Sequence, residues 1–158
     1  MNEPRIDAEL LDRWARLLVN HSLDVVTADD RVMIKGGRIA WPLMERIVRE
    51  VIAGGGVPDV CLVPPNNERG KVWSASMGRL ASAEQLEKAP AWHRERYASM
   101  TKYVEVLGAE DPASYAGLSA EAAAALARAD RPFADLRLSR RWVITLYPTP
   151  AYAEMEGM

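Results

Sequence analysis

The sequence predicts an α/β domain: a three-layer sandwich with a mainly parallel sheet of four to five strands and helices on both faces. Short runs of β-branched and aromatic residues alternate with amphipathic helical patterns, which is typical of parallel sheets. The connections between them are short. The predicted strands are 31–35, 57–63, 103–107 and 142–146. A chain of 158 residues fits a single domain, 1–158, with a core of its own.

In the first third of the chain, Asp7 is a suitable N-cap for a helix. The apolar face of that helix is expected at helical spacing, on Leu10, Leu11, Trp14, Leu17, Leu18 and His21. Gly36 and Gly37 should end the first strand, and Pro42 suits the first turn of the next helix. Gly54 to Gly56 should end that helix. Val57 and the run Val60 to Val63 give the strand 57–63 an apolar character, which predicts burial on both faces.

The middle of the chain, 64–77, is predicted as a loop with a short irregular strand over 71–76. Two short helices should follow, over 82–87 and 92–100. Ser119 is a predicted N-cap for a helix over 120–128, and a separate helix should begin at Pro132. The last strand, 142–146, is expected to be buried on both faces.

The overall charge excludes some classes of partner. The formal net charge is -2, with acidic and basic residues mixed along the chain. We therefore expect no nucleic acid and no membrane among its partners. Cys61 is the sole cysteine, which excludes an internal disulfide. The opening residues lack the pattern of a signal peptide, so we expect a cytoplasmic protein.

The chain contains few signals for chemistry. It has no nucleotide-binding glycine fingerprint, and Gly36-Gly37 is better explained as a tight turn. The two histidines, His21 and His93, have no second ligand at a useful spacing, so we expect no metal site and no catalytic residue in this chain. Cys61 lies in mid-strand, where cysteine is usually inert. Trp73, in the long loop region, is a candidate for lining a substrate cleft.

The end of the chain carries a family resemblance. The segment Trp142-Val-Ile-Thr-Leu-Tyr-Pro-Thr-Pro-Ala-Tyr-Ala153 resembles the one that closes the N-terminal domain of the thermophilic-type metallo-aminopeptidases, the aminopeptidase T and aminopeptidase S family. Asp111, Pro112 and Leu118 also fit a pattern of that family. The resemblance covers essentially the whole chain, and members of the family are about twice as long.

The resemblance implies an enzyme that removes N-terminal amino acids from peptides. Two divalent metal ions (Zn, Co or Mn) would lie in a C-terminal catalytic domain that this chain lacks. The implied partners are that domain, a peptide substrate and a second copy in a homodimer. Pro148 and Pro150 fix the backbone after the last strand, at the sheet edge where α/β proteins bind ligands. Thr149 and Tyr152 are therefore candidates for the substrate cleft.

Two alternatives remain open at this stage. The ring-cleaving dihydroxypyridine dioxygenases resemble the same peptidases in organisation and use iron at a related site. A free-standing α/β binding module is the other alternative. The reading frame beyond Met158 separates the module from the enzyme.

Overall fold

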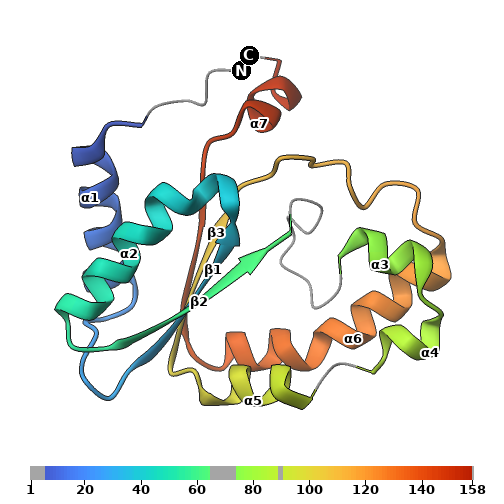
Figure 1. The fold of residues 1–158 in the computed structure, drawn as a ribbon, viewed down its shortest axis with the longest axis horizontal. Helices are drawn as coiled ribbons and strands as arrows, with labels where there is room; N and C mark the ends of the chain where they lie inside the picture. Colours follow the sequence, from blue (N-terminus) through green and yellow to red (C-terminus); the bar gives the residue numbers. More distant parts are fainter. Residues whose placement is uncertain (1–5, 65–73, 89–90, 158) are drawn as a thin grey trace.

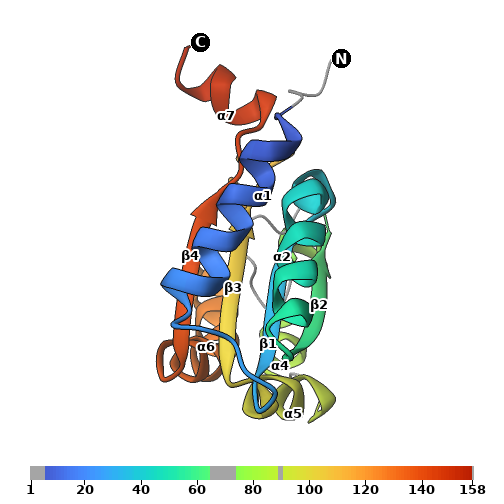
Figure 2. The same cartoon turned by 90° about the vertical axis from the view of Figure 1, so that its left-hand side faces the viewer.

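The computed structural model describes residues 6–64, 74–88 and 91–157, which form a four-stranded parallel sheet with helices on both faces (Figures 1 and 2). The order across the sheet is β2-β1-β3-β4, and each neighbouring pair is parallel. The strands are β1 (Arg31–Gly37), β2 (Val57–Val63), β3 (Lys102–Leu107) and β4 (Arg141–Leu146). The predicted α/β class and strand number are confirmed.

One face of the sheet is covered by two helices and the other face by α5 and α6 (Figure 2). The first group is α1 (Ala8–Leu17), which continues as the π-helical η1 (Leu18–Ser22), and α2 (Trp41–Ala53), which follows the short η2 (Arg38–Ala40). The second is α5 (Ala91–Ser99) and α6 (Ala120–Leu138), on which α3 (Ala75–Leu80) and α4 (Ala83–Leu86) pack. Among the described residues no helix has the length and apolarity to cross a membrane.

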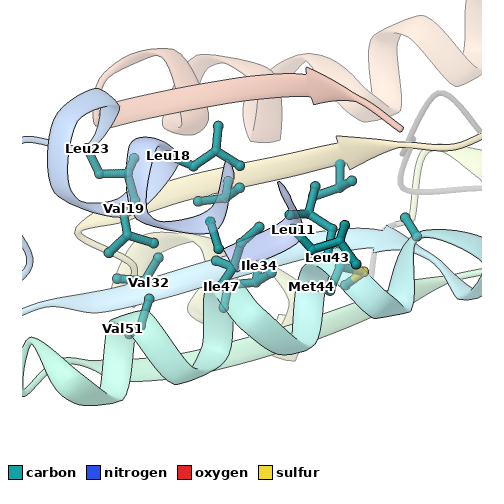
Figure 3. Packing of buried hydrophobic residues seen from close by; sticks show 14 of the residues in the cluster. Leu11, Leu18, Val19, Leu23, Val32, Ile34, Leu43, Met44, Ile47 and Val51 are labelled. Atoms are coloured by element: carbon teal, nitrogen blue, oxygen red, sulfur yellow. The ribbon is translucent and has the colours of Figure 1, made fainter. Parts of the chain in front are cut away.

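The larger core lies between the sheet and the helices α1 and α2 (Figure 3). Asp7 caps α1 as predicted, because its Oδ1 accepts a hydrogen bond from Glu9 N at 3.0 Å. The buried face of the helix differs from the prediction: Leu10 and Leu17 are exposed, whereas the smaller Ala15 is buried. The small side chain of Ala15 lets α1 lie close to the core. The spacing of the large apolar residues does not reveal this close approach.

Strand β1 continues through Gly36 and Gly37, where the sequence predicted its end. A Cβ atom added at Gly36 would lie 2.7 Å from Met44 Sδ and 2.9 Å from the carbonyl oxygen of Val106. The glycine is therefore required by the close approach of α2 and β3 to the strand, and not by a turn.

Two further predictions are corrected in the chain beyond β2. Residues 120–138 form a single helix with Pro132 inside it, in place of two helices. Pro132 is exposed, so water can bond the carbonyl group that the missing N–H leaves free. Residues 74–76 belong to the start of α3, capped by Ser74, and not to a strand. The predicted strand residues 71–73 lie outside the described residues.

The predictions of burial on both faces were wrong for β2 and β4. These strands are the two edges of the sheet, so each has a neighbouring strand on one side within the described fold. Val57 and Leu62 of β2 are 53% and 57% exposed. On β4, Trp142, Ile144 and Leu146 are 43%, 44% and 56% exposed. Apolar character does not identify an edge strand, because the sequence of a single strand does not reveal its position in the sheet.

We expect Gly36→Ala to lower the free energy of unfolding by about 1–3 kcal/mol, because the new methyl group has no room beside Met44 and the Val106 carbonyl. Urea unfolding followed by circular dichroism measures the change. Gly37→Ala is the matched control, since its Cβ would meet nothing nearer than the Gly108 carbonyl oxygen at 3.4 Å. Equal losses in the two variants would contradict the packing explanation.

Candidate functional site: the carboxyl-edge cleft

A cleft of about 560 Å³ lies at the carboxyl edge of the sheet. Parallel strands all end at this edge, so the segments that follow β1, β3 and β4 meet there. The cleft is lined by Arg38 and Ile39 after β1, by Ala109 and Glu110 after β3, and by Pro150, Ala151 and Glu154 of α7 (Pro150–Met155). Figure 1 shows α7 above this end of the sheet.

Charged groups from two of these segments form an ion pair. Arg38 Nη2 donates a hydrogen bond of 3.0 Å to Glu110 Oε1. The Arg38 side chain is 80% exposed and that of Glu110 is 26% exposed, so the pair adds little to stability. Glu154 brings a second carboxylate to the same cleft. The lining therefore combines one guanidinium and two carboxylates with apolar surface, a mixture that is common in ligand pockets.

The helix α7 is fixed to the sheet by contacts at its start. Tyr147 N donates a 2.7 Å hydrogen bond to the Leu107 carbonyl, which extends the pairing of β4 with β3 by one residue. The Tyr147 ring is buried and stacks on Trp14, with the ring centroids 6.3 Å apart. Thr149 then caps the helix, because its Oγ1 accepts from Tyr152 N at 3.2 Å. The cleft wall formed by Pro150 and Ala151 is thus held by β4.

The structure gives the predicted cleft residues different positions. Thr149 is 3% exposed and serves as the cap of α7, while its neighbour Pro150 lines the cleft. Tyr152 is half-buried on α7 and is not among the lining residues. Trp73 lies outside the described residues. The functional roles of the three residues stay predictions. The sequence did contain the signal for α7, because threonine followed by proline is a typical helix start.

The residues of this cleft do not form a metal site. Within residues 6–64, 74–88 and 91–157 no group of three or more histidine, cysteine, aspartate or glutamate side chains is close enough to hold an ion. Cys61 is half-buried on β2. The described residues therefore offer no basis for deriving a metal-dependent step.

A second group of polar residues lies inside the fold, between the sheet and α5. Lys35 of β1 and Glu105 of β3 are register partners and are 3% and 4% exposed. Lys35 Nζ donates to Tyr97 Oη at 3.0 Å, and Tyr103 Oη donates to Glu105 Oε2 at 2.9 Å. Burial, together with the neighbouring Glu105 carboxylate, raises the pKa of Tyr103 well above its usual value. These groups bind one another, so we assign them a structural role.

The ring of His93 lies at the margin of these polar residues. It packs edge-on against Phe133 at 4.8 Å and lies 5.1 Å from the ring of Tyr97. Its buried Nε2 has no hydrogen-bond partner among the described residues. Burial and the positive charges of Lys35 and Arg96 lower the pKa of His93, and Asp130 opposes this shift. The folded protein therefore favours the neutral ring.

The structure is an α/β domain with a cleft at the carboxyl edge of its parallel sheet. Residues 7–156 match the model of the family described as thermophilic metalloprotease (M29). The chain belongs to this family. The predicted family resemblance is confirmed.

A solved structure described as wild-type AmpT from Thermus thermophilus has a similar fold, with a TM-score of 0.65 and 24% sequence identity. The match covers 92% of this chain and 38% of the AmpT chain. This chain thus spans less than half the length of that relative. No curated protein matches the chain.

We expect the stability of the fold to fall as the pH drops below about 6.5, the ordinary pKa of histidine. The unfolded chain then takes up a proton that the folded state resists at His93, so protonation favours unfolding. In His93→Phe this part of the pH dependence should disappear. The measurement is the thermal midpoint between pH 7.5 and 5.5.

His21→Phe provides the control, because His21 lies exposed on η1, away from the polar residues. This variant should keep the pH dependence of the parent. If His93→Phe and the parent lose the same number of degrees over that interval, the explanation is wrong.

Proposed function

We propose that this chain is the amino-terminal domain of a metal-dependent aminopeptidase, which removes N-terminal amino acids from peptides. The observation that carries the proposal is the match of residues 7–156 to a metalloprotease family. The similarity in fold to AmpT, over 38% of the AmpT chain, supports a domain within a longer enzyme. A peptide substrate and a catalytic domain on the same polypeptide are the proposed partners, and a homodimer stays a prediction.

In the proposed enzyme, two divalent ions (Zn, Co or Mn) are held by residues outside this chain. Such ions would supply an activated water molecule for attack on the peptide bond. The residues of this chain bind and orient the substrate instead.

The carboxyl-edge cleft is the proposed wall of the substrate site. Ile39, Pro150 and Ala151 provide an apolar surface for side chains of the peptide, while Arg38, Glu110 and Glu154 provide charged groups at its rim. The ion pair of Arg38 with Glu110 fixes the orientation of both side chains without burying either charge fully. Such a surface excludes water from one side of the substrate and limits the positions it can take.

The ring-cleaving dioxygenase alternative is not favoured, because the matching family consists of metalloproteases. The free-standing binding module differs from the proposal in one observable property. A reading frame that continues beyond Met158 with spaced glutamates and histidines fits the enzyme, and a stop codon at that point fits the module.

The proposal is tested with leucine p-nitroanilide. The product of the complete reading frame should release p-nitroaniline, lose this activity with EDTA and regain it with Co²⁺, Mn²⁺ or Zn²⁺. The 158-residue chain should be inactive under the same conditions, because its described residues hold no ligand cluster. Metal-dependent release by the 158-residue chain, or ring cleavage of a dihydroxypyridine by the complete protein, would refute the assignment.

A second experiment tests the wall. Ala151→Phe fills part of the cleft, so we expect it to lower kcat/KM for peptides at least tenfold in the complete enzyme. Ala153→Phe is the matched control, since Ala153 is equally half-buried on α7 but does not line the cleft. Both variants should melt at similar temperatures. Similar kinetics in the two variants would show that the cleft does not contact the substrate.

A further inference from the structure

The edge strand β4 presents an apolar face to solvent. Trp142, Ile144 and Leu146 alternate along the strand and are 43%, 44% and 56% exposed. Their register partners in β3 include Tyr103, whose side chain packs with the residues of α5 and α6. The three side chains therefore lie on the α5–α6 side of the sheet, because residues in register on parallel strands share a face.

The side chains on the opposite face of β4 pack against other parts of the fold. Val143 packs against the core beneath α1 and α2, and Thr145 is half-buried. On the α5–α6 side, Figure 1 shows α6 approaching the sheet near the start of β4, with α7 beyond the other end of the strand. Of the three apolar side chains, Leu146, near the carboxyl edge, is accordingly the most exposed.

The two edges of the sheet differ in how they meet solvent. Strand β2 carries Pro58, which has no N–H to offer, and Asp59, which forms a bidentate ion pair with Arg96 at 2.8 Å. Proline and inward-pointing charge are devices that protect free edges from pairing. Between Trp142 and Leu146 strand β4 has no proline and no charged residue. The free edge of β4 therefore lacks these protective features, and another part of a protein can pack against it.

The small size of this face indicates the kind of partner. Three partly exposed side chains offer at most a few hundred Å² of apolar surface. A stable interface between separate chains buries roughly 1,600 Å² in total. A partner tethered to the same polypeptide needs far less area, because the tether raises its effective concentration. Strand β4 is followed by α7, which lies beyond the carboxyl end of the strand, so a further domain on the same polypeptide would be tethered close to β4.

We propose that the catalytic domain of the same polypeptide docks on β4, with its apolar side chains on Trp142, Ile144 and Leu146. This inference rests on the proposed function, since it requires a longer enzyme. Tyr147 is not part of this surface, because its side chain is 4% exposed and packs on Trp14.

The first test is amide hydrogen exchange in residues 141–146. We expect exchange at least tenfold slower in the complete protein than in the 158-residue chain. Leu146→Glu should remove this protection and lower the melting temperature of the complete protein, with little effect on the 158-residue chain. Leu62→Glu on the β2 edge is the matched control, because Leu62 is 57% exposed, and it should leave the protection of β4 unchanged.

Three outcomes would overturn the inference: equal exchange in the two proteins, equal effects of the two glutamate variants, or a reading frame that stops at Met158. Self-association of the 158-residue chain that Leu146→Glu abolishes, measured by light scattering, would identify a second copy as the occupant instead. None of these readouts depends on peptidase activity. An inactive complete protein with a protected β4 would therefore refute the proposed function and leave the docking surface standing.

Discussion

The close approach of α2 and β3 to Gly36 is the contact on which the arrangement of the other elements depends. Strand β1 pairs with β2 on one side and with β3 on the other, so it lies between these two strands in the sheet. The absence of a side chain at Gly36 lets Met44 of α2 fill the space above it. Because η2 and α2 follow β1 directly, the same contact fixes where Arg38 and Ile39 enter the carboxyl-edge cleft.

The two faces of the sheet are stabilised by different interactions. Val32 and Ile34 of β1 face an apolar core formed with α1 and α2. On the other face, Lys35 and Glu105 bring buried charge between the sheet and α5. The cost of removing these charges from water is offset by hydrogen bonds to Tyr97 and Tyr103. The bond from Lys35 to Tyr97 also connects the sheet to α5.

The sequence predicted the strands and most of the helices because those depend on local periodicity and caps. Asp7 and Ser119 are helix caps in the structure as they are in the sequence pattern. The failures concern properties that depend on distant residues. Nothing near Leu146 indicates that β4 is an edge of the sheet formed by the described residues, and nothing near Gly36 indicates that Met44 will contact it.

The candidate site was less predictable than the fold. The carboxyl edge followed from the parallel topology, but the candidates Thr149 and Tyr152 are not among the residues that line the cleft there. The lining residues Arg38 and Glu110 were missed because they belong to loops 72 positions apart. The buried residues Lys35 and Glu105 had a signal that could have been used: each is a charged residue inside a strand, directly after apolar or aromatic residues.

A domain that holds no metal ion itself can still control the rate of a metalloenzyme through geometry, and in the described part of this chain no ligand cluster is present. Strand β4 carries both the proposed docking face and, three residues later, the cap of α7. The hydrogen bond from Tyr147 N to the Leu107 carbonyl holds the segment between them on the sheet. In the proposed enzyme, the position of Pro150 and Ala151 relative to the metal ions is therefore set by how the catalytic domain sits on β4. A small rotation at that interface would move the cleft wall with it, because no flexible linker separates the two.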